Sequence, residues 1–159
     1  MEKTLPTFPT FEDLETYKAA RSFRKSMYAV SRTLPDFEKF ELASQIRRAA
    51  VSLTNNIAEG HGRWHYLDHI KFVLQARGSL EELHDDLNIC EDEHYLPPTE
   101  IARLKEQAVQ VRKLLNGYLR YLRDRKVGSS LSLREDSCDY NETDDELELW
   151  LITLPLQPN

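Results

Sequence analysis

The amino-acid sequence predicts an all-α protein, an up-down-up-down antiparallel four-helix bundle followed by a C-terminal acidic tail. Two observations support this prediction. Apolar residues recur at three- and four-residue steps in four long segments, as amphipathic helices require. Short stretches that contain proline or glycine, at 34–36, 60–62 and 94–98, separate these segments. We therefore expect an N-terminal arm at 1–10, the bundle at 11–127 and the tail at 128–159.

The first helix is expected from residue 11 to about Thr33, and Thr10 with Asp13 forms a variant of the capping box at its start. Its apolar stripe consists of Thr16, Ala19, Ala20, Phe23, Met27, Val30 and Leu34. Another face interleaves cations with aromatic rings, namely Tyr17, Arg21, Arg24, Lys25, Tyr28 and Arg32. Such a face suits nucleic acid, because cations contact phosphates and rings stack on bases. The simpler alternative is that the tyrosines pack on a neighbouring helix or subunit while the cations extend into water.

The second helix is expected from about Phe37 to Gly60, after a Leu34-Pro35 turn in which Asp36 serves as the N-cap. Its apolar stripe is Leu42, Ile46, Ala49, Ala50, Leu53 and Ile57. A second side carries short polar or charged residues, which let another helix approach closely: Ser44, Arg48, Ser52, Asn55 and Glu59. Gly60 and Gly62 are expected to end the helix in the left-handed conformation of a C-cap, and the alternative is that this glycine pair lets a backbone or a phosphate approach closely.

Arg48 and Glu59 lie about 16 Å apart along the second helix and cannot pair with each other. Each therefore needs another partner, such as Arg63 or Arg77 for Glu59. One interpretation is a structural ion-pair network that sets helix register, and the other is a ligand or nucleic-acid site. The structural interpretation is favoured because such networks commonly resemble sites.

The third helix is expected from about Trp64 to Glu93 and has a broad apolar sector of two ridges: Ile70, Val73, Leu80 and Leu87, and Phe72, Ala76, Leu83 and Cys90. This breadth predicts one partner inside the bundle and one outside it, hence an oligomer. Gly78 and Ser79 are expected where another backbone passes closely. His61, His65 and His69 are spaced by four residues, so His65 and His69 are a candidate metal pair. No second ligand cluster follows, and the expectation is an exposed or interfacial histidine row without metal.

The fourth helix is expected from about Pro98 to Lys126, with an apolar heptad pattern at Ile101, Leu104, Ala108, Val111, Leu115, Tyr118 and Leu122. Its end carries four cations, Arg120, Arg123, Arg125 and Lys126. These cations complement the helix dipole. They also form a second candidate surface for phosphate or a partner.

Charge is distributed unequally along the chain. The net charge of −6 arises in the tail, which holds one arginine and eight acidic residues, whereas residues 1–127 hold 20 basic and 19 acidic residues. The acidic segment leads into an apolar strip at 149–156, which predicts either a peptide that docks on a partner or simple disorder. Cys90 and Cys138 form no disulfide framework, and no segment has signal-peptide or membrane-span character. The expectation is a cytoplasmic protein without cofactor or membrane partner.

The stretch SQIRRAAVSLTNNIAEGHGR, residues 44–63, resembles the signature of the bacterial large-subunit rRNA intervening-sequence protein family, whose members are four-helix bundles. LPDFEKFELASQ before it and ARGSLEELHDDL after it extend the resemblance over about residues 11–126. Thr54 stands where many members have proline. The resemblance implies an all-helical homopentamer without enzymatic activity. It also implies a polar network formed by the motif residues Gln45, Arg47, Arg48, Asn56, Glu59 and Arg63.

A more distant similarity connects this family to the accessory variability determinants of diversity-generating retroelements, which bind nucleic acid and a reverse transcriptase. The leading hypothesis is a non-enzymatic homo-oligomer that binds RNA, DNA or a nucleoprotein through basic faces of its first and last helices. The alternative is a scaffold that docks a partner through its acidic-hydrophobic tail. No nucleophile and base are paired in a recognisable motif, so an enzyme is not expected.

Overall fold

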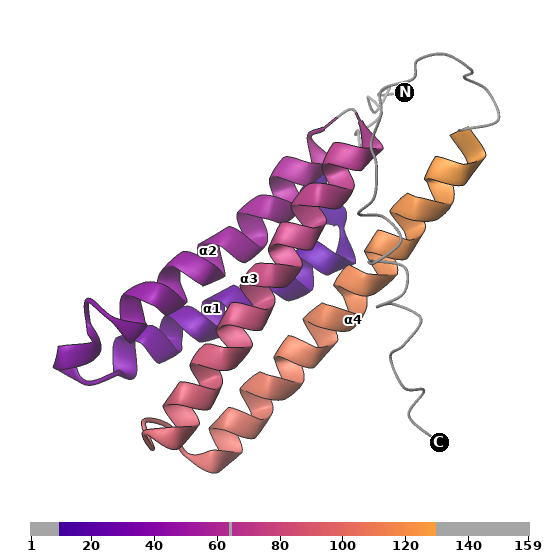
Figure 1. Cartoon of the computed structure of the whole chain (residues 1–159). Coiled ribbons are helices and arrows are strands. Elements are labelled where there is room, and N and C mark those ends of the chain that lie inside the picture. Colours follow the sequence, from indigo (N-terminus) through magenta and orange to yellow (C-terminus); the bar gives the residue numbers. More distant parts are fainter. Residues whose placement is uncertain (1–9, 64, 130–159) are drawn as a thin grey trace, which may run out of the picture. The chain divides into compact units, whose positions relative to one another are not determined.

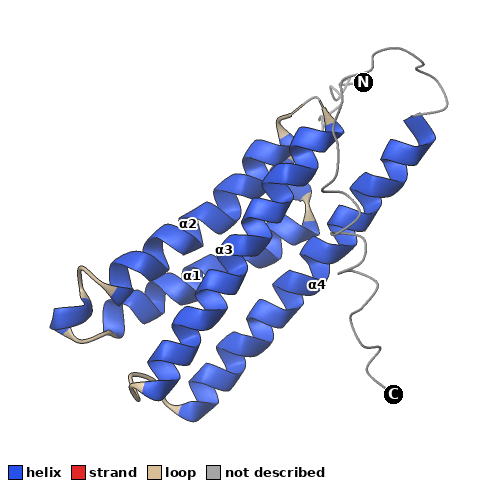
Figure 2. Ribbon diagram, in the orientation of Figure 1, coloured by secondary structure: helices blue, strands red, loops and turns tan. Residues whose placement is uncertain are grey.

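The computed structural model describes residues 10–63 and 65–129, with side chains as far as Asp124. Within this range the chain forms no strand and four α-helices: α1 (Glu15–Thr33), α2 (Leu42–His61), α3 (Tyr66–Asp92) and α4 (Pro98–Ser129). The helices alternate in direction (Figures 1 and 2). The all-α four-helix prediction is therefore confirmed. The predictions for residues 1–9, for Trp64 and for the tail from residue 130 lie outside the described residues.

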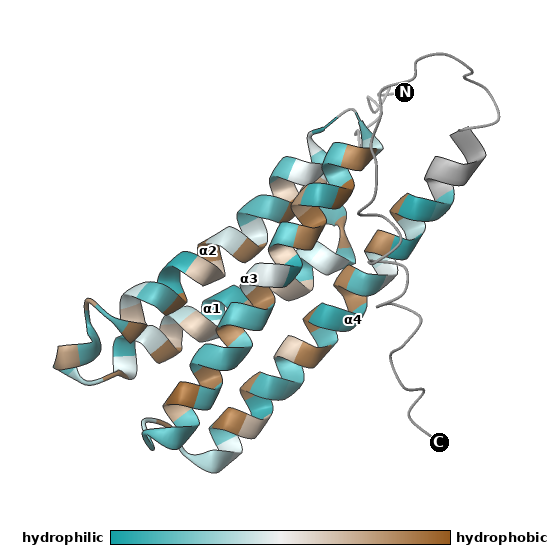
Figure 3. Cartoon of the chain, in the orientation of Figure 1, coloured by the Kyte–Doolittle hydropathy of each residue, from teal (hydrophilic) through white to brown (hydrophobic). Residues whose placement is uncertain are grey.

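All four helices contribute one side to a common core, and apolar residues recur along each of them (Figure 3). The predicted stripe of α2 is buried throughout. In the stripe predicted for the first helix, only Ala19 and Leu34 are half-buried, and Leu34 lies just after α1. In α4 six of the seven heptad residues are buried. Tyr118 is half-buried, and Leu119 is buried beside it. Helical spacing of apolar residues thus places the core correctly.

The broad apolar sector of α3 is covered within the chain. Val73, Ala76, Leu80, Leu83, Leu87 and Cys90 are fully buried, and Ile70 and Phe72 are half-buried. Both ridges are used because α3 contacts α2 on one side and α4 on another, as the Ser79–Ser52 hydrogen bond and the Arg112–Glu81 ion pair show. The fully buried part of this sector is thus covered within the chain, and the oligomer that its breadth predicted stays a prediction.

Two short 3-10 helices, η1 (Phe11–Asp13) and η2 (Asp36–Glu38), shift the starts of α1 and α2. The predicted capping box of Thr10 and Asp13 is present, but it caps η1. The predicted N-cap role of Asp36 is wrong, because Asp36 lies inside η2 and α2 begins at Leu42. The Glu38 carboxylate accepts a hydrogen bond from the Leu42 backbone N–H at 3.2 Å instead. At the other end, α4 continues through Gly128 and Ser129, which the sequence assigned to the tail.

The glycines near the end of α2 do not form the predicted left-handed cap; Gly60 instead leaves room for a neighbouring helix. No glycine among the described residues has positive φ, and the C-cap Gly62 is right-handed at φ −77°. A Cβ on Gly60 would lie 3.0 Å from both His69 Cδ2 and Phe72 Cβ. Gly60 is therefore required because α3 passes directly over it.

The Gly78-Ser79 pair divides between two environments. The Ser79 hydroxyl is buried and donates a hydrogen bond to Ser52 Oγ at 2.8 Å, which confirms close approach there. Gly78 is exposed, and no described atom lies within 4 Å of the position its Cβ would take. The expectation that a backbone passes over Gly78 is wrong for the described chain.

Two glycine-to-alanine substitutions should therefore have opposite effects. Gly60→Ala should lower the free energy of unfolding by about 1–2 kcal/mol, because the new methyl group displaces α3. Gly78→Ala should raise it by about 0.5–1 kcal/mol, because alanine has the higher helix propensity and meets no obstacle. Urea unfolding followed by circular dichroism measures both. Destabilisation by Gly78→Ala would contradict the open environment assigned to this position.

Candidate nucleic-acid interface

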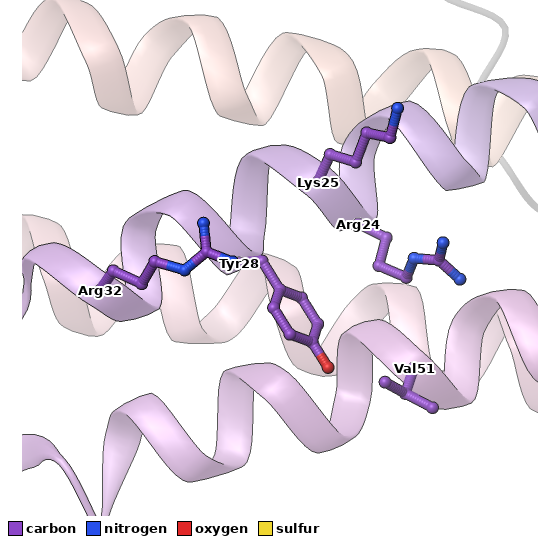
Figure 4. A pocket seen from close by; sticks show the side chains of 5 residues that line it. All are labelled: Arg24, Lys25, Tyr28, Arg32 and Val51. Atoms are coloured by element: carbon purple, nitrogen blue, oxygen red, sulfur yellow. The ribbon is translucent and has the colours of Figure 1, made fainter.

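An open groove runs between α1 and α2 on the surface of the bundle. Arg24, Lys25, Tyr28 and Arg32 of α1 and Val51 of α2 line it, and its volume is about 440 Å³ (Figure 4). The four α1 residues share one side of that helix because they are spaced by one, three and four residues. We call this feature the α1–α2 groove. Four of the six residues of the predicted basic-aromatic face therefore meet in one site.

One cation of the groove is held in place. The Arg24 Nη1 donates a hydrogen bond to Thr54 Oγ1 at 2.8 Å, and Thr54 Oγ1 donates to the Val51 carbonyl oxygen at 3.2 Å. Thr54 is 1% exposed, so the hydroxyl is a fixed acceptor. The threonine thus supplies a guanidinium contact that a proline at this position would lack. The remaining N–H groups of Arg24 stay available to a ligand.

The groove carries positive charge that no neighbour neutralises. Within the described part of the chain, no acidic side chain forms an ion pair with Arg24, Lys25 or Arg32. The described ion pairs involve other cations, for example Arg112 with Glu81 at 2.7 Å between α4 and α3. A concave surface with charge of one sign concentrates ligands of the opposite sign. The groove is thus suited to phosphate groups.

The other predicted contact residues lie elsewhere. The Tyr17 ring packs edge-on against Phe11, with centroids 4.8 Å apart, and contacts the core, which supports the packing interpretation for this tyrosine. Arg21 is exposed on α1 but does not line the groove. Arg120 and Arg123 are exposed and half-exposed on α4 and also lie outside it. Arg125 and Lys126 belong to α4, but their side chains lie outside the described residues.

The motif residues do not join in one polar network. Asn56 Nδ2 donates to the backbone oxygen of Ser52 at 2.9 Å, and the Arg47 Nη2 donates to the Lys39 carbonyl oxygen at 3.2 Å. Arg63 pairs with Glu59 at 2.5 Å, which confirms one of the two partners expected for that carboxylate. Arg48 is exposed, with no hydrogen bond or ion pair to another described residue. These separate contacts are typical of a structural role.

The sequence analysis missed a buried carboxyl group, Asp86. It is 0% exposed, and its Oδ1 accepts a hydrogen bond from Gln45 Nε2 at 2.8 Å. Its Oδ2 has no hydrogen-bond partner among the described residues. Burial and the nearby negative charge of Glu82 raise the pKa of Asp86 to about 7, although the Gln45 hydrogen bond opposes the shift. The signal was available, because Asp86 falls between Leu83 and Cys90 on the apolar side of α3.

The histidines take different environments. The His69 ring is buried, shares a 2.9 Å hydrogen bond with the Tyr118 hydroxyl, and lies 6.2 Å from the His61 ring. Burial, and secondarily the proximity of His61, lowers the pKa of His69. His65 is exposed at the N-cap of α3. In the described ranges no group of three or more His, Cys, Asp or Glu side chains is arranged to hold a metal ion.

Burial also governs Cys90, whose thiol is 0% exposed in the core. Burial, together with the negative charges of Asp86 and Glu38, raises the pKa of this thiol to about 11. A thiol that is neutral and inaccessible is a weak nucleophile.

Of the helices that the structure describes, none is long and apolar enough to cross a membrane.

The fold and the groove place this chain among the small, all-helical four-helix-bundle proteins. Residues 12–117 match the 23S rRNA-intervening sequence protein family, and the chain belongs to this family. The match confirms the resemblance carried by residues 44–63.

A solved structure agrees with the fold. A crystal structure of a protein with unknown function from the S23 ribosomal protein family of Bacteroides thetaiotaomicron VPI-5482 superposes with a TM-score of 0.62 at 19% sequence identity. The superposition covers 66% of this chain and 95% of that chain. No curated protein matches the sequence.

The buried carboxyl group predicts a pH-dependent stability. The folded-state pKa of Asp86, about 7, lies above the ordinary value of 3.8, so between pH 4 and pH 7 the folded chain holds a proton that the unfolded chain has lost. The Asp86 contribution to the unfolding free energy should therefore fall as pH rises through this window. Asp86→Asn keeps an oxygen for Gln45 without a charge. It should stabilise the protein at pH 8 by on the order of 1–3 kcal/mol and have little effect at pH 4.

Urea unfolding at pH 4, 6 and 8 measures this effect, and Asp92→Asn is the control because Asp92 is an exposed carboxylate of the same helix that is not among the groups shifting the pKa of Asp86. An equal pH profile for Asp86→Asn and the parent protein would exclude Asp86 as the titrating group.

Proposed function

We propose that this protein is a non-enzymatic homo-oligomer that binds nucleic acid, alone or within a nucleoprotein, through the α1–α2 groove. The observation that carries the proposal is the composition of the groove: three cations and a tyrosine meet in one concavity. No acidic side chain lines that concavity. Phosphate oxygens are the anions that such an arrangement favours.

Each lining residue has a distinct part in this proposal. Lys25 and Arg32 contact phosphates and release the counterions that the phosphates hold. Arg24 is oriented by Thr54, so less side-chain entropy is lost when it binds. The Tyr28 ring offers a plane for stacking on a sugar or a base. The whole bundle is nearly neutral, so binding depends on this local charge rather than on the net charge.

The comparisons support RNA over DNA as the ligand. The family description refers to intervening sequences of 23S rRNA, and the solved relative is described as a member of a ribosomal protein family. On this basis we propose that the ligand is RNA and that the protein binds it in the cytoplasm.

Self-association is part of the proposal. Four exposed apolar side chains on α3 and α4 support it: Leu67, Ile89, Leu114 and Tyr121. The family resemblance supports five subunits. An oligomer presents several grooves, and simultaneous contacts by one strand raise the overall affinity above that of a single groove.

Removing two groove cations should weaken RNA binding and its salt dependence. The double variant with Lys25→Gln and Arg32→Gln should reduce the slope of log affinity against log salt by about 1.4, because each single-strand phosphate contact contributes about 0.7. Fluorescence anisotropy with a labelled oligonucleotide at several salt concentrations measures the slope. Lys113→Gln is the control, because Lys113 is an exposed cation of α4 outside the groove. Equal slopes for the double variant and the control would exclude the groove as the phosphate site.

The proposed oligomer predicts a solution mass several times that of one chain. Size-exclusion chromatography with light scattering should give a multiple of 18.6 kDa, with five copies as the expected number. A mass of one chain across the accessible concentration range would remove self-association from the proposal.

A further inference from the structure

We infer that the loop between α1 and α2 stacks on unpaired bases, so that the ligand of the α1–α2 groove is single-stranded rather than duplex nucleic acid. The inference rests on the proposed function of the groove. It arises from a separate observation, the exposure of two phenylalanine rings. Phe37 is 71% exposed and Phe40 is 79% exposed, more than any other large apolar side chain in the described ranges.

The loop that carries these rings is held in place by side chains beneath it. Glu38, which lies between the two phenylalanines, accepts hydrogen bonds from the Tyr95 hydroxyl at 2.8 Å and from the Leu42 backbone N–H at 3.2 Å. The Tyr95 ring also meets Phe37 edge-on, with centroids 6.4 Å apart. The Arg47 Nη2 donates to the Lys39 carbonyl oxygen. The rings are therefore displayed by an anchored loop, which lowers the entropic cost of binding to them.

The anchored loop lies at one end of the groove. The Arg24–Thr54 hydrogen bond sets the register of the antiparallel pair α1 and α2. One helical turn further, Tyr28 lies opposite Val51, and both line the groove (Figure 4). A further turn leads to Arg32, which lies in the last turn of α1 and directly precedes the loop. A strand that follows the cations from Arg24 to Arg32, about 12 Å along the helix, therefore arrives at the loop.

The chemistry of the loop favours bases over phosphates. Its carboxylates, Asp36, Glu38 and Glu41, outnumber the single cation Lys39, so the loop is net negative and does not attract a polyanion by charge. The Lys39 ammonium lies 5.4 Å from the centroid of the Phe40 ring, which leaves part of the ring free. Flat, exposed rings next to a cationic track are the two elements of single-strand recognition. Paired bases in a duplex do not expose their faces to side chains, whereas unpaired bases do.

The experiment compares three ligands of equal strand length with the full chain. The ligands are a labelled single-stranded RNA of about 12 nucleotides, the matching duplex, and a single strand of abasic sugars. Fluorescence anisotropy gives the affinity of each for the parent protein, for Phe37→Leu and for Phe40→Leu. Leucine keeps the apolar surface but removes the ring, and the exposure of both positions makes unfolding of the variants unexpected. Lys113→Gln is the control, because Lys113 is an exposed residue of α4 outside the groove and the loop.

The expected result is that the parent protein binds the intact single strand roughly 5- to 100-fold more tightly than the abasic strand. Each phenylalanine substitution should cause a loss of affinity of that size for the intact strand only, and Lys113→Gln should leave the preference for the intact strand over the abasic strand unchanged. Equal affinity for intact strand, abasic strand and duplex would overturn the inference and leave the groove function standing. Absence of binding to all three would overturn both. A change of oligomeric mass in the phenylalanine variants without a change of affinity would assign the loop to a contact between copies and overturn the inference.

Discussion

The close contact between α2 and α3 is the constraint on which the rest of the bundle depends. It is made at three levels along the two antiparallel helices: Gln45 with Asp86, Ser52 with Ser79, and Gly60 with His69. Small or hydrogen-bonding side chains occupy every level, so neither helix can rotate or slide without breaking a buried contact. With α3 fixed on this side, the other side of α2 faces α1 and forms one wall of the groove.

The position of the groove follows from which sides of α1 are buried and which remain at the surface. The side of α1 that carries Phe23 and Met27 is buried in the core. Arg24, Tyr28 and Arg32 lie one position further along the helix, at the edge where α2 meets α1. A cationic residue at such an edge keeps its stem on apolar surface and its charge in water. The same geometry that closes the core thus places the cations in a row.

Much of this could be predicted from the sequence, because helix periodicity depends only on the chain itself. The core residues of α1, α2 and α4 and the cationic-aromatic face of α1 were found in this way. The spacing of Phe37 and Phe40 gave no such signal, because their exposure depends on the 3-10 turn and on Tyr95, which is distant in sequence. The role of Gly60 was foreseen only as the less favoured alternative to a cap, because the obstacle to a side chain there comes from α3. Asp86 was overlooked although its place on the apolar side was visible.

The three-level contact of α2 and α3 also has a consequence for the order in which the chain folds. The paired residues are separated by 27 positions for Ser52 and Ser79 and by 41 for Gln45 and Asp86, while Gly60 and His69 flank the short connection between the helices. The entropy lost on closing a loop grows with its length, so the contact at the connection is the least costly to form first. Once Gly60 and His69 are in contact, the loop that must still close to bring Ser52 to Ser79 is shorter. We therefore expect the hairpin of α2 and α3 to close from its turn outward.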